Sequence, residues 1–210
     1  MKTVLCFGDS NTFGYRPDNG MRYDKDTRWT GKLQNLLGSE YNVVEEGCNG
    51  RTAVGIDPFE EWKYGMTYLK PCLNSHKPID TFIIMLGSND LKSIFFNPVE
   101  NIARGVENMV KVVKEFLTKK QGFAPEIIVI SPPHIGPGIA TSPFRDRFTW
   151  EAIGKSQEFA TYYKIVADKQ GCKFIDAAEH IEPSQIDSLH LDASEHSELA
   201  TVIYRTIIEA

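Results

Sequence analysis

Short apolar runs alternate along the whole chain with longer segments whose apolar residues recur at helical spacing. The most apolar run, "IDTFIIML" at Ile79–Leu86, predicts a central strand that is buried on both faces. Strands that alternate with helices predict a parallel sheet with helices on both faces, because parallel neighbours need a long crossover connection. The expected strands are Lys2–Phe7, Tyr41–Glu46, Ile79–Leu86, Glu126–Ile130 and Lys173–Asp176.

The segments between these strands carry the spacing and the end signals of amphipathic helices. In the first, Trp29, Leu33 and Leu37 recur on one face, and Gly38 can end the helix. In the last, Asp192 and Glu195 have the spacing of a capping box. No repeat or linker interrupts the 210 residues, so we expect one domain over residues 1–210. The expected helices are Trp29–Leu37, Met66–Leu73, Pro98–Lys119, Trp150–Lys169 and Ser194–Ile208.

Composition argues against several classes of partner. The formal net charge is -5, whereas a nucleic-acid surface needs a basic stripe. No apolar run approaches the ~20 residues that a membrane span needs. The run Thr3–Phe7 is too short for the core of a signal peptide, so we expect a cytoplasmic protein. The four cysteines are scattered without a C-x-x-C pair, and no metal site is expected.

Polar segments follow the strands at the points where the strands end. In a parallel sheet these ends meet at one edge, where ligands bind at a topological switch point. Together the segments supply a hydroxyl, a glycine amide, a carboxamide, and an imidazole with a carboxylate. They are Gly8–Asn11 after the first strand, Gly47–Thr52 after the second, Gly87–Asp90 after the third, and Asp187–His190 beyond the fifth.

These groups are the parts needed for acyl transfer. A serine hydroxyl is a weak nucleophile that needs an adjacent base, and His190 can take the proton of Ser10. Asp187, three residues before His190, can fix its tautomer and stabilise the imidazolium. The amides of Ser10 and Gly50 and the side chain of Asn89 can donate to the oxyanion of a tetrahedral intermediate.

Each segment also has a structural explanation. Ser10 alone is more often a turn or helix-cap residue, and Gly50 can simply mark a turn with positive φ. Asn89 can satisfy the loop after the central strand. Residues interpreted as structural are Asp9, Asp90 and, at the surface or at helix caps, His76, His180 and His196.

The alternative from another functional class is a flavodoxin-like module that binds FMN. Ser10-x-Thr12-x-Gly14 after the first strand faintly resembles a phosphate loop, and a hydroxyl-rich helix start can hold a phosphate. That interpretation leaves Asn89 and the Asp187–His190 unit without a role. We therefore rank ester hydrolysis first.

Taken together, the four segments resemble the sequence blocks of the SGNH hydrolase superfamily, also called GDSL esterases. Gly8-Asp9-Ser10 resembles its first block, Gly50 its glycine block, Gly87–Asp90 its G-x-N-D block and Asp187–His190 its D-x-x-H block. Asn11 stands where the family name has leucine, which changes the polarity of the site floor without removing a catalytic group. Because every catalytic position is filled, an inactive carbohydrate-binding relative is disfavoured.

Further stretches resemble a bacterial arylesterase and acyltransferase subfamily. The resemblance implies a flavodoxin-like three-layer α/β/α sandwich with a five-stranded parallel sheet. It also implies no metal, no cofactor and small ester substrates with short acyl or aryl groups, with acyl transfer as a further activity. The matching stretches are Val4–Ser10, Arg28–Gly31, Glu45–Thr52, Ile83–Asp90 and Ser131–Pro133.

Residues near the blocks are candidates for contact with substrate. Phe13, Tyr15 and Lys92 follow the nucleophile or the oxyanion asparagine, and His134 lies in a long loop at Pro132–Phe148. This loop exceeds the ~2–6 residues usual between a strand and a helix, and a long loop rich in Gly, Pro and aromatics is typical of a lid, a binding wall or a subunit contact. Its apolar side chains would be partly exposed in a monomer, and subfamily relatives use such an insertion to assemble, so we expect a homo-oligomer. Those side chains are Ile135, Ile139, Phe144 and Phe148.

Overall fold

Five parallel strands form the centre of the protein in a computed structural model that describes residues 1–209. Their order is β2-β1-β3-β4-β5, which is the flavodoxin-like order and confirms the predicted fold class. Every neighbouring pair is parallel. The strands are β1 (Lys2–Gly8), β2 (Tyr41–Gly47), β3 (Thr81–Met85), β4 (Glu126–Ser131) and β5 (Lys173–Asp176).

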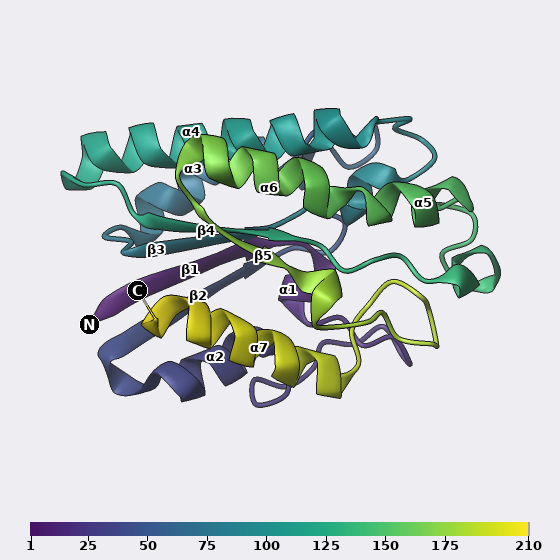
Figure 1. Cartoon of the computed structure of the whole chain (residues 1–210), viewed down its shortest axis with the longest axis horizontal. Coiled ribbons are helices and arrows are strands. Elements are labelled where there is room, and N and C mark those ends of the chain that lie inside the picture. The colour runs from purple at the N-terminus through teal and green to yellow at the C-terminus, as the bar shows by residue number, and fades with distance from the viewer. Residues whose placement is uncertain (210) are drawn as a thin grey trace.

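Helices cover both faces of this sheet and give three layers (Figure 1). On one face, a buried apolar cluster lies between the sheet and helices α3, α4 and α6, and α5 lies beyond α6 on the same side. On the other face, a second cluster lies between the sheet and helices α2 and α7. The helices are α2 (Trp29–Leu37), α3 (Gly65–His76), α4 (Val99–Gln121), α5 (Glu151–Gln157), α6 (Phe159–Gln170) and α7 (Ala193–Ile208).

The central strand β3 contributes to both cores. All five of its residues are buried. Phe82 and Ile84 point into the cluster under α3, α4 and α6, whereas Ile83 and Met85 point into the cluster under α2 and α7. Burial on both faces explains why this strand is a continuous apolar run rather than an alternating one.

Two local predictions about helices were wrong. The segment Trp150–Lys169, predicted as one helix, is divided at Glu158 into α5 and α6. Just before the break, the Ser156 hydroxyl accepts from the Ile135 amide and donates to the Ile153 carbonyl, which competes with regular helix bonding. At α7 the capping box is absent, because Asp192 makes no side-chain cap bond.

The loop at Pro132–Phe148 also differs from expectation. It includes a short 3₁₀ helix at Pro137–Thr141, and Ile135, Ile139 and Phe148 are each at most 2% exposed within a single chain. The predicted exposure of its apolar residues was therefore wrong for these three. The argument that this loop needs a second subunit to cover it does not hold.

His196 is fully buried rather than at the surface. It faces α2, where the Trp29 amide donates to its Nδ1 at 3.3 Å. By contrast, His180 is exposed as expected, and His76 is partly buried against Glu46. Within residues 1–209, no helix combines the length and the apolar character needed to cross a membrane.

Candidate active site

The nucleophile candidate lies in the sharp turn that follows β1. The chain leaves the strand at Gly8 and enters a single helical turn, α1 (Ser10–Phe13), in which the Asn11 amide donates to the capping side chain of Asp9. A Cβ on Gly8 would lie 2.1 Å from Thr12 Oγ1, so only glycine fits where the turn folds back on the strand. This tight turn presents Ser10 at the carboxyl edge of the sheet.

Ser10, His190 and Asp187 form a continuous chain of hydrogen bonds. His190 Nε2 lies 2.9 Å from Ser10 Oγ, and His190 Nδ1 lies 2.6 Å from Asp187 Oδ2. The other carboxylate oxygen of Asp187 accepts from the Leu189 and His190 amides at 3.0 and 2.9 Å. Ser188, between the acid and the base, has a φ of 59°, which closes the loop tightly enough for this pairing.

The environment of Asp187 keeps it ionised. Its burial would raise the pKa of the carboxyl, but hydrogen bonds and the nearby charge of His190 outweigh this and hold the pKa below its ordinary value. A carboxylate at this position fixes the imidazole with Nε2 facing Ser10. The three side chains are therefore arranged for proton transfer from Ser10 to His190.

The three residues predicted to donate to the oxyanion, Ser10, Gly50 and Asn89, line one cavity. Gly50, with a φ of +82°, and Asn89, in a 3₁₀ turn after β3, both line it together with Ser10. The Asn89 side-chain amide donates to Asp9 at 3.3 Å, a long bond that leaves its second proton for a ligand. The proposed oxyanion donors therefore come together as the sequence predicts.

Two charged residues beneath the site hold its loops in place. Asp90 is fully buried, and its carboxylate accepts from the amides of Ala53, Val54 and Gly55 at 2.8 Å each. Burial raises the pKa of Asp90 to about 6, although these amides oppose the rise. Arg51 donates to the Gly8 carbonyl at 2.8 Å. These bonds fix the loop that follows Gly50, residues 51–55, to the ends of β1 and β3.

The cavity in front of Ser10 has a volume of about 250 Å³. Of the predicted substrate-contact residues, Tyr15 and Lys92 line it, and the Tyr15 ring lies 4.1 Å from the His190 ring. Phe13 and His134 do not line it. Phe13 instead lies under the Arg22 guanidinium, 4.6 Å from it.

Several residues that line the cavity were not identified from the sequence. Phe144 packs edge-on against the His190 ring at 5.2 Å. Phe144 and Phe148 belong to the long aromatic-rich loop, for which a binding wall was one of the roles considered, and both line the cavity. Asn49 and Leu189 lie inside predicted segments of the site and Arg147 lies in the long loop, whereas Lys63 carried no sequence signal.

One group of metal-ligand side chains lies outside this cavity. Within residues 1–209, ligand atoms of Glu46, Cys72 and His76 lie within 4.8 Å of one another. The sequence signal was the four-residue spacing of Cys72 and His76 on α3. His76 Nε2 contacts Glu46 Oε1 at 2.7 Å, and burial raises the pKa of Cys72 to about 12. The histidine and carboxylate partner one another, so we assign the group no part in the site.

Comparisons with known proteins place the whole chain among proteins of similar sequence and fold. The model of the GDSL-like lipase/acylhydrolase family matches residues 6–196. Est24, a carbohydrate acetylesterase from Sinorhizobium meliloti, is 34% identical, with 100% of this chain and 99% of that chain covered and a TM-score of 0.92. The inhibitor-bound aryl esterase of M. smegmatis is 32% identical, with the same coverage and a TM-score of 0.93. Comparison with curated protein sequences found no match.

Proposed function

The chain belongs to the GDSL-like lipase/acylhydrolase family and is a carboxylic ester hydrolase, and we propose that it cleaves small esters through an acyl-enzyme on Ser10. The observation that carries this mechanism is the hydrogen-bonded chain from Ser10 through His190 to Asp187 at the edge of the cavity. Family membership alone does not name the nucleophile, whereas this series of hydrogen bonds points to a single hydroxyl, that of Ser10.

The chemistry proceeds in two halves. Ser10 Oγ attacks the ester carbonyl while its proton passes to His190 Nε2, and Asp187 stabilises the imidazolium. The carbonyl oxygen becomes an oxyanion that accepts from the amides of Ser10 and Gly50 and from the Asn89 side chain. His190 then protonates the leaving alcohol. In the second half, a water molecule repeats the attack and releases the acid.

The size and walls of the cavity support short acyl or aryl groups. A space of about 250 Å³ holds only a small ester, and Tyr15, Phe144 and Phe148 give it an aromatic wall. The solved structures named above as a carbohydrate acetylesterase and an aryl esterase agree with this size range. Aromatic walls that limit water also favour an alcohol as acceptor, so acyl transfer belongs to the same proposal.

The FMN-binding alternative lacks structural support in the first loop. Ser10 Oγ is already engaged with His190. Thr12 is fully buried under the turn, so its hydroxyl does not face the cavity. A phosphate would find neither hydroxyl available.

Replacement of the nucleophile tests the mechanism. Ser10→Ala is expected to abolish cleavage of 4-nitrophenyl acetate while the thermal unfolding midpoint changes little. An organophosphate is expected to label Ser10 in the parent, as peptide mass spectrometry would report. Ser75→Ala, at an exposed position on α3, serves as the matched control and should retain full activity. Substantial turnover by folded Ser10→Ala protein would exclude Ser10 as the nucleophile.

A further inference from the structure

The walls of the Ser10 cavity divide by chemistry. Tyr15, Phe144 and Phe148 make one part aromatic, as described above. Three further lining residues, Lys63, Lys92 and Arg147, are cationic, and none of the described residues that line the cavity is acidic. These three positive charges come in addition to the donors already assigned to the oxyanion of a neutral ester.

Lys92 is the most unusual of the three. It is only 8% exposed and lies three residues beyond Asn89 in the same turn, where its amide donates to the Asn89 carbonyl at 3.3 Å. No hydrogen bond or ion pair within residues 1–209 stabilises its ammonium, and burial followed by the charges of Lys63 and Arg147 lowers its pKa. The charges of Asp57 and Asp9 partly oppose this lowering. Lys92 lines the cavity without a hydrogen-bonded partner for its ammonium among the described residues, so a ligand in the cavity can supply the negative charge that pairs with it.

Lys63 is held directly over the oxyanion loop. A methyl group built on Gly50 would lie 3.1 Å from Lys63 Nζ, so the ammonium covers the Gly50 backbone. The Thr52 amide donates to the Lys63 carbonyl at 3.0 Å and fixes this position. Glu60 pairs with Lys63 from the rim and is itself 41% exposed. Lys63 is therefore partly neutralised. Lys92 and Arg147 also line a neighbouring cavity with Asp57, Glu60 and Asp146, but neither forms an ion pair within residues 1–209, which leaves these two as the main candidates for binding an anion.

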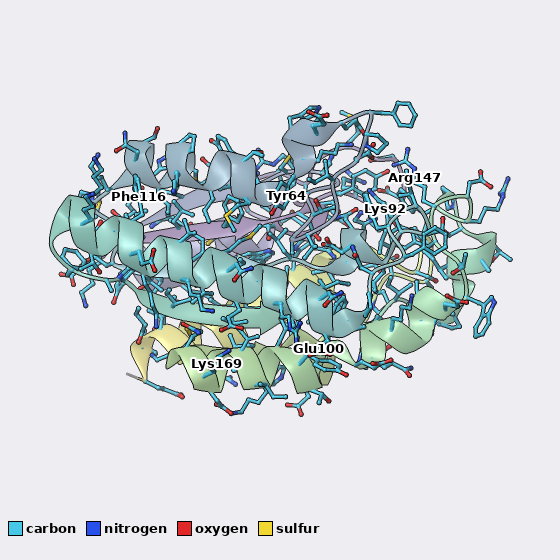
Figure 2. The ribbon with its side chains drawn as sticks, turned by 90° about the horizontal axis from the view of Figure 1, so that it is seen from above. Tyr64, Lys92, Glu100, Phe116, Arg147 and Lys169 are labelled. Atoms are coloured by element: carbon cyan, nitrogen blue, oxygen red, sulfur yellow. The ribbon has the colours of Figure 1, made fainter. Side chains whose placement is uncertain are left out.

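Arg147 is tied to the segment that carries Lys92. The Ser93 amide donates to the Arg147 carbonyl at 2.9 Å, so the two loops are joined at the residue next to Lys92. Lys92 and Arg147 are labelled at the same end of the molecule in Figure 2. A guanidinium fork beside an ammonium suits a carboxylate, whose two oxygens can be bound at once.

From this arrangement we propose that the substrates are esters that carry a carboxylate close to the scissile bond, bound by Lys92 and Arg147. The inference assumes ester cleavage at Ser10. The apolar part of such an ester lies against Tyr15 and Phe144, and its charge faces Lys92 and Arg147. The carboxylate belongs either to the acyl group, as in a half-ester of a dicarboxylic acid, or to the alcohol, as in an acylated hydroxy acid.

Two matched pairs of esters test the preference. For a charge on the acyl group, 4-nitrophenyl hydrogen glutarate is compared with 4-nitrophenyl pentanoate. For a charge on the alcohol, 4-acetoxybenzoate is compared with its methyl ester. Each kcat/KM is divided by the rate of alkaline hydrolysis of the same ester. We expect the anionic member to be preferred at least tenfold in one pair, and we expect added NaCl to reduce that preference.

Variants assign the preference to the cations. In Lys92→Met and Arg147→Met, the ratio of anionic to neutral kcat/KM is expected to fall about tenfold, mainly through a higher KM for the anionic ester. Arg145→Met is the matched control, because Arg145 lies two residues from Arg147 and does not line the cavity. Its ratio is expected to equal that of the parent.

The outcomes separate this inference from the proposed function. A neutral preference in both pairs, or an equal loss on both members in Lys92→Met, would overturn it, since equal loss means that the cations only stabilise the oxyanion. If no ester is cleaved, the proposed function fails, and calorimetry of glutarate and 4-hydroxybenzoate on the parent decides the anion site. Binding that is lost in Lys92→Met supports the site, and absence of binding to the parent refutes it.

Discussion

The side-chain amide of Asn11 donates to the Leu189 carbonyl at 3.3 Å, in the buried interior beneath the cavity. Asn11 follows Ser10 and Leu189 precedes His190, so one hydrogen bond joins the neighbours of the proposed nucleophile and base. The Trp29 indole also donates to the Asn11 carbonyl at 3.1 Å. A leucine at position 11, as in the family name, could not make the bond to Leu189.

This bond predicts a directional effect of an isosteric replacement. Asn11→Asp exchanges the donor for an acceptor that faces a carbonyl oxygen in a buried site. At pH 8 we expect the free energy of unfolding to fall by about 3 kcal/mol, because a buried charge loses water without gaining a partner. At pH 5 the loss should be smaller, since a carboxyl pKa raised by burial lets the protonated acid donate to the carbonyl. Urea unfolding at both pH values measures the change.

Asn19→Asp is the matched control, because Asn19 is exposed and near the same end of the chain. Its unfolding free energy is expected to stay within about 0.5 kcal/mol of the parent at both pH values. An Asn11→Asp protein as stable as the parent at pH 8 would show that the Asn11–Leu189 bond does not hold the two loops together.

Asp187 predicts the shape of the pH–rate profile. Because its pKa is held below the ordinary value, Asp187 stays ionised above pH 5 and adds no step of its own to the rise of kcat/KM with pH that a histidine base predicts. Asp187→Asn should reduce kcat on the order of 10³–10⁴-fold without unfolding the protein. Initial rates with 4-nitrophenyl acetate across pH 5 to 9 measure both, with Asp192→Asn as control. A profile that is flat while chemistry limits the rate would rule out His190 as the base.

Replacement of Asn89 is expected to change kcat but not KM. If its side chain donates to the oxyanion only in the transition state, Asn89→Ala should lower kcat by ~10²–10³ and leave KM nearly unchanged. Asn97→Ala, in the neighbouring loop outside the Ser10 cavity, controls for loop disturbance and should keep the parent kcat. A change in KM alone would instead make Asn89 a substrate-binding or structural residue.

The sequence predicted the sheet well because buried parallel strands leave a strong apolar signal. The structure differs from the expected ends of β3 only by shortening Ile79–Leu86 to Thr81–Met85. The meeting of Ser10, Gly50, Asn89 and His190 was also predictable, since strand ends of a parallel sheet share one edge. The parallel topology brings these residues together although they lie far apart in the sequence.

The parts that escaped prediction depend on how irregular segments pack. Lys63 and Arg147 belong to loops whose paths are fixed only by bonds such as Thr52 to Lys63, which leave no pattern in the sequence. The burial of Ile139 likewise comes from tertiary packing. With that loop buried, the homo-oligomer stays a prediction, for which light scattering on the purified protein is the measurement.

His196 is a different case, because its burial had a readable signal. His196, Leu199, Ala200, Ile203 and Ile207 recur at three- and four-residue steps and form the buried stripe of α7. Its Nδ1 accepts from the Trp29 amide, and its Nε2 has no partner within residues 1–209. Burial, with smaller effects from the charges of His190, Lys32 and Arg28, lowers the pKa of His196 to about 3. The imidazole is therefore neutral in the folded protein.

This buried imidazole predicts a loss of stability in mild acid. Its folded pKa of about 3 lies below the unfolded value of ~6.5, so the stabilisation is complete above pH 6.5 and is lost as the pH falls. Between pH 7 and pH 5 this group alone should cost about 2 kcal/mol of unfolding free energy. In His196→Gln, which keeps an acceptor but cannot titrate, that pH-dependent loss should shrink by the same amount. His180→Gln, at an exposed site, should keep it. If urea unfolding gave His196→Gln the same loss as the parent, His196 would not be the group that titrates.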